Sequence, residues 1–144
     1  MITAIDPDLR KSGVCRLDNR GNIIFLSSCE ISTLVLLIQT NNTDTYVIED
    51  VNKIKAMYNR GAKTNNNRIA QNVGMCKGVG TVITDIVKSY AINPPIMAPV
   101  GIGKQVKKDA KLFARLSGWE KSSNEDMRDA WAIARWYWLD HFNK

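Results

Sequence analysis

Four acidic residues occupy positions that suggest chemistry rather than solubility. Asp6 directly follows a short apolar run, and Glu49 ends a run that is rich in β-branched and aromatic residues. Asp126 and Asp129 are three residues apart in a helical pattern, so they face the same side of that helix. If the two runs form neighbouring strands, a helix packed across their ends brings all four carboxylates together.

Such a group of carboxylates repels itself unless cations are bound. Hard oxygen ligands favour Mg²⁺ or Mn²⁺ over zinc. Two such ions about 4 Å apart activate water and stabilise the leaving oxygen in phosphodiester hydrolysis. The sequence therefore predicts a metal-dependent nuclease whose ligands are Asp6, Glu49, Asp126 and Asp129.

Each acid also has an ordinary structural explanation. Asp6 can begin a turn with the proline that follows it, because aspartate favours turns. Asp126 fits a capping box with the serine three residues before it, and Asp129 can face solvent. Glu49 is harder to explain in this way, because it lies in an otherwise apolar run. These alternatives stay open at the level of the sequence.

Positive charge is concentrated in the middle of the chain. Residues 51–123 contain 13 Lys or Arg and 3 Asp or Glu, whereas the remainder contains 7 basic and 11 acidic residues. The net charge is +6. A basic surface attracts phosphate backbones in a salt-sensitive way. The charge pattern favours a nucleic-acid partner, with an ordinary solvated face as the alternative.

The hydrophobic periodicity predicts the elements that position these residues. Strands are expected at 2–5, 13–18, 23–28, 45–49 and 96–100. Helices are expected at 32–39, 67–90, 104–116 and 124–142, with a polar loop at 52–66. Three strands in a meander, followed by strands alternating with helices, predict an α/β fold. We expect a mixed five-stranded sheet flanked by helices, in one domain spanning 1–144.

Glycines are expected to allow turns or close approach. Gly13 is interpreted as part of a turn after the first strand. Gly74, Gly78 and Gly80 lie in the long helix, where they cost helix propensity. They are expected to permit close packing, either on the sheet or across a dimer interface.

Several protein classes are disfavoured by composition. The three cysteines form no C-x-x-C pair, which argues against a disulfide framework or a zinc site. No apolar run approaches the roughly 20 residues of a membrane span, and the start of the chain lacks the basic leader of a signal peptide. We therefore expect a cytoplasmic protein. His141 is interpreted as a surface residue rather than a catalyst.

Three segments, in order, resemble the motifs of RuvC-type Holliday junction resolvases of the RNase H-like superfamily. Residues 4–13 (AIDPDLRKSG) resemble the family's first motif, in which a hydrophobic strand ends in Asp-Pro-Gly. Residues 46–51 (YVIEDV) resemble the second motif, and 126–134 (DMRDAWAIA) the last. Asp8 departs from the pattern, because the family commonly has glycine there. The compact length and the Met-Tyr-Asn-Arg-Gly segment after Glu49 resemble bacteriophage members.

The resemblance implies an RNase H-like fold, two Mg²⁺ (or Mn²⁺) ions per subunit on the four acids, and a homodimer. It implies a substrate of four-way junctions or other branched DNA, cut by metal-activated water, and a location in the host cytoplasm if the source is viral. It also places Lys104 or Lys107 near the scissile phosphate, and an aromatic wedge, Tyr58, in the loop after Glu49. The residues expected to contact DNA are Lys53, Lys55, Tyr58, Arg60, Lys63, Arg68 and Lys108.

Two alternative functions remain at this stage. One is a nuclease of the same fold acting on RNA–DNA hybrids or flaps. The other is a catalytically silent nucleic-acid-binding module, against which the presence of acids at all four positions argues.

Overall fold

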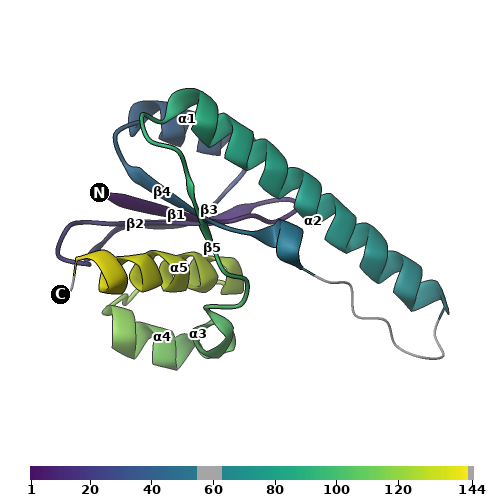
Figure 1. Cartoon of the computed structure of the whole chain (residues 1–144). Helices are drawn as coiled ribbons and strands as arrows, with labels where there is room; N and C mark the ends of the chain where they lie inside the picture. Colours follow the sequence, from purple (N-terminus) through teal and green to yellow (C-terminus); the bar gives the residue numbers. More distant parts are fainter. Residues whose placement is uncertain (55–62, 143–144) are drawn as a thin grey trace.

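The computed structural model describes residues 1–54 and 63–142, with the backbone alone for residues 63–65. The strands are β1 (Ile2–Asp6), β2 (Ser12–Leu17), β3 (Ile23–Cys29), β4 (Thr45–Glu49) and β5 (Ile96–Ala98). The helices are α1 (Ile31–Thr40), α2 (Lys63–Tyr90), α3 (Lys104–Lys108), α4 (Ala110–Ser117) and α5 (Glu125–His141), with a 3₁₀ turn η1 at Val51–Lys53. Figure 1 shows their arrangement.

The five strands form one mixed sheet in the order β3-β2-β1-β4-β5. The first three strands are an antiparallel meander, whereas β1, β4 and β5 run parallel. The predicted mixed five-stranded sheet is therefore confirmed, as is the expectation that the first and fourth strands are neighbours. Because β1 and β4 are parallel, Asp6 and Glu49 end at the same edge of the sheet.

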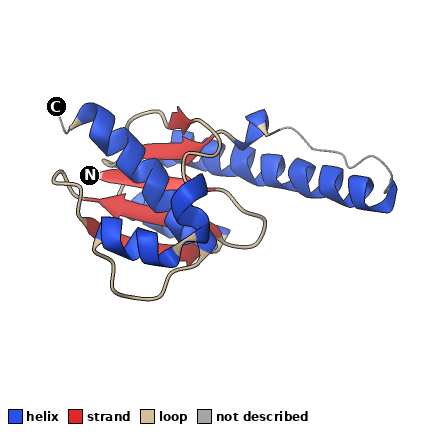
Figure 2. Ribbon diagram, turned by 90° about the horizontal axis from the view of Figure 1, so that it is seen from below, coloured by secondary structure: helices blue, strands red, loops and turns tan. Residues whose placement is uncertain are grey.

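Helices cover both faces of this sheet, as Figure 2 shows. On one face, α5 packs over the central strands, with α3 and α4 beside it. On the other face, α1 and α2 pack together and enclose a second hydrophobic core. Both faces of β1 are thus buried, which agrees with its nearly continuous apolar sequence.

No helix in the described part of the chain combines the length and the apolar character that crossing a bilayer requires.

Three predicted elements have different bounds in the structure. The helix expected at 104–116 is two helices, because Asp109 has an extended backbone and its side chain accepts a hydrogen bond from the Leu112 amide (2.9 Å). Such a side-chain cap starts a new helix. In addition, α2 begins at Lys63, within the predicted loop at 52–66, and β5 ends at Ala98 rather than at residue 100.

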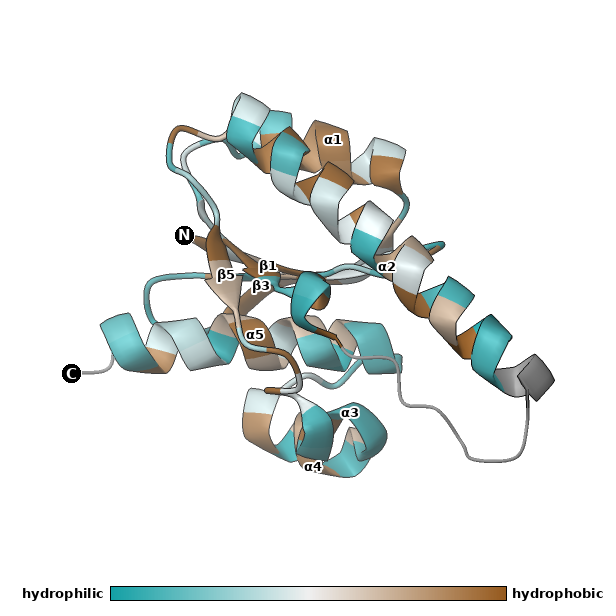
Figure 3. Cartoon of the chain, turned by 45° about the vertical axis from the view of Figure 1, so that its right-hand side comes forward, coloured by the Kyte–Doolittle hydropathy of each residue, from teal (hydrophilic) through white to brown (hydrophobic). Residues whose placement is uncertain are grey.

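The glycines of α2 divide into two kinds. A Cβ at Gly80 would overlap the Val51 side chain, so this glycine permits close packing within the subunit. A Cβ at Gly74 or Gly78 would meet nothing within 4 Å. Figure 3 shows hydrophobic residues on several turns of this helix, including turns that no other element covers. One side of α2 therefore packs on the protein, and another is exposed.

Candidate active site

The two strand-end acids lie side by side. Ile5 of β1 pairs with Ile48 of β4, so the following residues, Asp6 and Glu49, occupy equivalent places at the sheet edge. Both are buried, with 5% and 7% exposure, and their carboxyl groups are close enough for each to affect the pKa of the other. The interpretation of Asp6 as a turn residue is not supported, because its side chain is turned into this buried site and its backbone belongs to β1.

Helix α5 contributes the other two acids. It begins after Asn124, whose side chain accepts a hydrogen bond from the Met127 amide (2.9 Å). Asn124, and not Ser123, is therefore the N-cap, and Asp126 is not the acid of a capping box. Asp129 lies one turn further along and is 5% exposed, so it does not face solvent. The two sequence-level alternatives for this pair are thus removed.

Gly13 lets the helix approach the strands. It lies within β2, directly opposite Asp6, and a Cβ there would overlap the backbone carbonyl of Asp126. The expectation of a turn at Gly13 was wrong, whereas its place in the second strand, expected at 13–18, is confirmed. Its role is to remove the side chain that would hold the first turn of α5 away from β1. This close approach joins the acids of α5 to those of the sheet.

The four carboxylates form one electrostatic unit. Burial, followed by the charges of Asp129 and Glu49, raises the pKa of Asp6 from its ordinary 3.8 to about 8. Burial also raises the pKa of Glu49, against the opposing effect of a hydrogen bond from the Gly101 amide to Glu49 Oε1 (3.0 Å). Burial, and then the charge of Asp8, raises the pKa of Asp126. The site thus holds more negative charge than its surroundings compensate.

Lys107 supplies a compensating charge. Its Nζ atom lies 2.6 Å from Asp129 Oδ2, and its side chain is about one-third exposed. Burial lowers the pKa of this ammonium, but its hydrogen bond and charge interaction with Asp129 more than offset that effect and raise the pKa overall. A cation therefore lies among the carboxylates even when the protein is considered alone.

The donor chemistry of the site fits a hard divalent cation, since all four side chains offer carboxylate oxygens. Within residues 1–54 and 63–142, however, no three acidic, His or Cys side chains converge closely enough to enclose an ion as they stand. Because Lys107 contacts only Oδ2 of Asp129, the other oxygen of this carboxylate could take part in holding an ion.

The other predicted residues fall into three groups. Lys104 and Lys108 are exposed on α3, and neither makes an ion pair with the described carboxylates. Lys53 follows β4 on η1 and pairs with Asp50 (3.4 Å), and Arg68 is exposed on α2. The structure thus places Lys107 at the carboxylates and Lys104 outside them. Lys55, Tyr58 and Arg60 lie outside the described residues, and Lys63 is described by its backbone alone.

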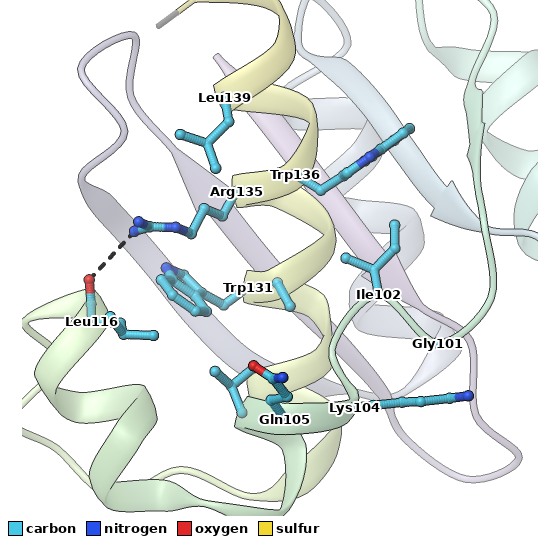
Figure 4. Close-up of a pocket in the computed structure, with 11 residues that line it drawn as sticks. Gly101, Ile102, Lys104, Gln105, Leu116, Trp131, Arg135, Trp136 and Leu139 are labelled. Carbon is cyan, nitrogen blue, oxygen red and sulfur yellow. Dashed lines mark hydrogen bonds between the residues drawn. The ribbon is translucent and has the colours of Figure 1, made fainter.

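A groove lies behind the site rather than in it. It has a volume of about 490 Å³ and runs between α5, α4 and the loop that contains Gly101 and Lys104. Figure 4 shows Trp131 on its floor and Arg135 reaching the Leu116 carbonyl (3.4 Å). The loop at 101–103 separates this groove from Glu49 and Asp129, since the Gly101 amide binds Glu49 on its other side.

Sequence reasoning missed the backbone contribution of this loop. A Cβ on Gly103 would overlap the Asp129 carboxylate, so the loop backbone lies directly against that acid. The signal was the pair of glycines at 101 and 103, shortly after a strand that ends at the same edge as Glu49. Glycines at such a place indicate close approach of the backbone.

The metal-free protein is expected to lose stability as the pH rises. Asp6 has a raised pKa when folded, so the folded state binds the extra proton between about pH 4 and pH 8. Binding of this proton stabilises the folded state fully at low pH, and that contribution to the free energy of unfolding is lost as the pH rises through this window. Each pKa unit corresponds to about 1.4 kcal/mol, so the loss is on the order of a few kcal/mol.

Thermal unfolding in EDTA, measured from pH 5 to pH 9, tests this pH dependence. Asp6→Asn removes the titrating group, so the advantage of this variant over the parent should grow with pH. A constant difference between the two proteins across that range would contradict the prediction.

Comparisons with known proteins agree on the fold. No protein-family model matches the sequence, and no curated protein matches it either. Among solved structures, the chain is similar to RuvC of Thermus thermophilus in complex with a Holliday junction substrate, with a TM-score of 0.60 and 13% identity over 96% of this chain and 93% of that chain. A second Thermus thermophilus RuvC structure gives a TM-score of 0.55 and 13% identity over 99% and 96%. The chain has the RNase H-like fold of these structures, as predicted.

Proposed function

We propose that this chain is a Mg²⁺-dependent endonuclease that resolves four-way DNA junctions, with residues 1–144 forming one nuclease unit. The observation that carries this proposal is the meeting of Asp6, Glu49, Asp126 and Asp129, from three separate segments, at one edge of a RuvC-like sheet. The similar structure that holds a Holliday junction substrate supports the choice of DNA.

The four carboxylates would hold the metal, with Mn²⁺ as a substitute and two ions per subunit. Ions at such a site polarise water and the phosphate oxygens during phosphodiester hydrolysis. The protein's own groups prepare this site. The Gly101 amide fixes one oxygen of Glu49, and burial of Asp6 keeps bulk water away from the carboxylates. Lys107, held beside Asp129, would lie where it can neutralise a phosphate oxygen.

Basic residues lie on two segments near the carboxylates. Lys104 and Lys108 belong to α3, as does Lys107, and Lys53 and Arg68 lie beyond the end of β4. We propose that these residues bind the phosphates of the junction arms. Lys55, Arg60 and Lys63 would extend this surface, and Tyr58 would act as the wedge.

A panel of synthetic substrates tests the proposed function. The protein should cut a four-way junction in Mg²⁺, should bind without cutting in EDTA, and should leave linear duplex intact. Faster cleavage of an RNA–DNA hybrid or of a flap would favour the related nuclease function. Binding without cleavage of any substrate, in Mg²⁺ or Mn²⁺, would identify a silent binding module.

We also propose that the working unit is a homodimer that makes paired cuts. A two-fold dimer matches the approximate symmetry of a four-way junction, and each chain offers one four-carboxylate site. The uncovered side of α2 supplies an interface, because Met75 and Val82 are exposed large hydrophobic residues and the space beside Gly78 is open.

Gly78→Leu is expected to leave the fold intact but to produce monomers. A Cβ at this position meets no atom of its own subunit within 4 Å, whereas a leucine there would obstruct a partner helix. Light scattering should give a mass of twice 16.2 kDa for the parent and of 16.2 kDa for the variant. On a supercoiled cruciform plasmid, the parent should release linear DNA and the variant nicked circles.

A control must lie away from Met75 and Val82, which excludes Asn72, the neighbour of Met75 one turn away. Lys88→Leu is the matched control, because Lys88 is exposed on the same helix about 120° round from Val82 and about 140° from Met75, so that variant should remain dimeric. A parent that is monomeric both free and on junction DNA would contradict the dimer proposal and leave the metal site untouched.

A further inference from the structure

Arg128 is a buried arginine between the two acids of α5. It is 7% exposed, although burying a guanidinium is costly unless its hydrogen bonds are satisfied. Its Nε atom donates to the carbonyl oxygen of Lys107 (2.8 Å). Its Nη1 atom donates to the carbonyl oxygen and to the hydroxyl of Ser123 (2.7 and 3.2 Å). One planar side chain thus links the end of α3 to the segment that precedes α5.

Helix α3 needs such a link. It has only five residues, too few for a helix to hold itself in place. Val106 is its one buried residue. The Lys107 carbonyl lies in its last turn, where helix carbonyls lack partners within the helix. Arg128 supplies that partner from α5.

The same residue of α3 carries the cation of the site. Lys107 binds Arg128 through its carbonyl oxygen and Asp129 through its Nζ atom. Adjacent residues of α5 therefore hold the backbone and the side-chain end of one lysine. A lysine side chain is flexible, so fixing its backbone decides whether its ammonium stays at the carboxylates.

We propose that Arg128 is a positioning residue, which keeps Lys107 at the carboxylates by fastening the end of α3 to α5. This inference rests on the proposed function where it concerns cleavage. The placement of Lys107 itself can be measured without metal or DNA.

Side-chain NMR of the metal-free protein measures this placement. The Lys107 ammonium should give a slowly exchanging ¹H–¹⁵N signal because it is hydrogen-bonded to buried Asp129, and Lys107→Met identifies that signal by its absence. The signal should disappear in Arg128→Met. It should also disappear in Arg128→Lys, which keeps the positive charge but not the two-pronged geometry. A signal that persists unchanged in both variants would overturn the proposal.

Arg16→Met is the matched control. Arg16 is another largely buried arginine, and its Nε atom binds Asp44 (2.8 Å) at the opposite end of β1 from the carboxylates. This variant should be less stable than the parent but should retain the Lys107 signal. Loss of the signal here would mean that any damage to the fold releases Lys107, which would overturn a specific role for Arg128.

Single-turnover cleavage of a four-way junction extends the test to function. Arg128→Met is expected to slow cleavage about 10–100-fold with unchanged junction affinity, as is typical of residues that support a metal site. Lys107→Met should slow it further, and the double variant should match Lys107→Met alone. If the double variant instead showed the product of the two single-variant rate losses, Arg128 would act independently of Lys107. A parental rate for Lys107→Met would instead contradict the proposed function of the lysine, and the NMR result would still decide its placement.

Discussion

A Glu49→Gln protein is expected to bind a four-way junction as the parent does and to cut it at least about a thousandfold more slowly. Glutamine keeps the shape of the side chain and can still accept the Gly101 amide hydrogen bond, so the loop at 101–103 should stay in place. The loss is one negative charge at the carboxylates. That charge is worth several kcal/mol of transition-state stabilisation when it holds a catalytic ion.

Binding should behave differently from cleavage, because DNA affinity depends on basic residues and on salt. Removing a carboxylate reduces repulsion of phosphate, so junction affinity should be equal or slightly higher. Asp6→Asn and Asp129→Asn should give the same separation of binding from cleavage. Gel-shift titration in EDTA and single-turnover cleavage in Mg²⁺ measure the two properties.

Asp50→Asn provides the matched control. Asp50 follows Glu49 directly, but its carboxylate pairs with Lys53 (3.4 Å). It should cut junctions at nearly the parental rate. If Glu49→Gln also cut at that rate, Glu49 would not be a ligand, and the metal site would have to be sought elsewhere.

The acids could be predicted from the sequence because each follows a recognisable pattern. Asp6 and Glu49 end two apolar runs, and runs of that kind form buried parallel strands. The three-residue spacing of Asp126 and Asp129 places them on one helix face. The first and fourth strands needed only to be neighbours, and the meander of the first three strands leaves one side of β1 free for β4.

The supporting contacts could not be predicted, because they depend on how closely elements approach in space. Glycine is a residue type that favours turns, yet Gly13 lies in a strand, where its lack of a side chain lets the backbone of Asp126 approach closely. The basic segment at 104–116 has one continuous helical pattern, whereas the cap at Asp109 splits it. The choice between Lys104 and Lys107 follows from that short α3 and its link to Arg128, which no local pattern indicates.

Gly103→Ala is expected to reduce cleavage by about a hundredfold or more, although the substitution adds only one methyl group. Gly103 has an ordinary backbone conformation (φ −83°), so alanine is not strained there by its own dihedral angles. The added Cβ would instead overlap the Asp129 carboxylate and press on Ala132, which lies 3.2 Å away. The Ala132 Cβ is fixed by the helix backbone, whereas the Asp129 carboxylate can rotate about its side-chain bonds, so the side chain of Asp129 is the part expected to move.

Displacement by about 1 Å is enough to cost a hundredfold in rate when a reacting group must be aligned. Junction binding should be unchanged, because no basic residue is altered. The bond between Lys107 and Asp129 should also weaken, since the same carboxylate accepts it. The defect should therefore appear in single-turnover cleavage under saturating DNA, and higher Mg²⁺ should recover only part of it.

Gly118→Ala separates this effect from a general loss of stability. Gly118 ends α4 in a left-handed conformation (φ +69°), which costs alanine about 1 kcal/mol, and a Cβ there would meet nothing within 4 Å. This variant should melt at a lower temperature than the parent and yet cut normally below its melting transition. Normal cleavage by Gly103→Ala would show that Asp129 can yield without loss of function, and its assignment as a metal ligand would fail even if Asp6 and Glu49 remained essential.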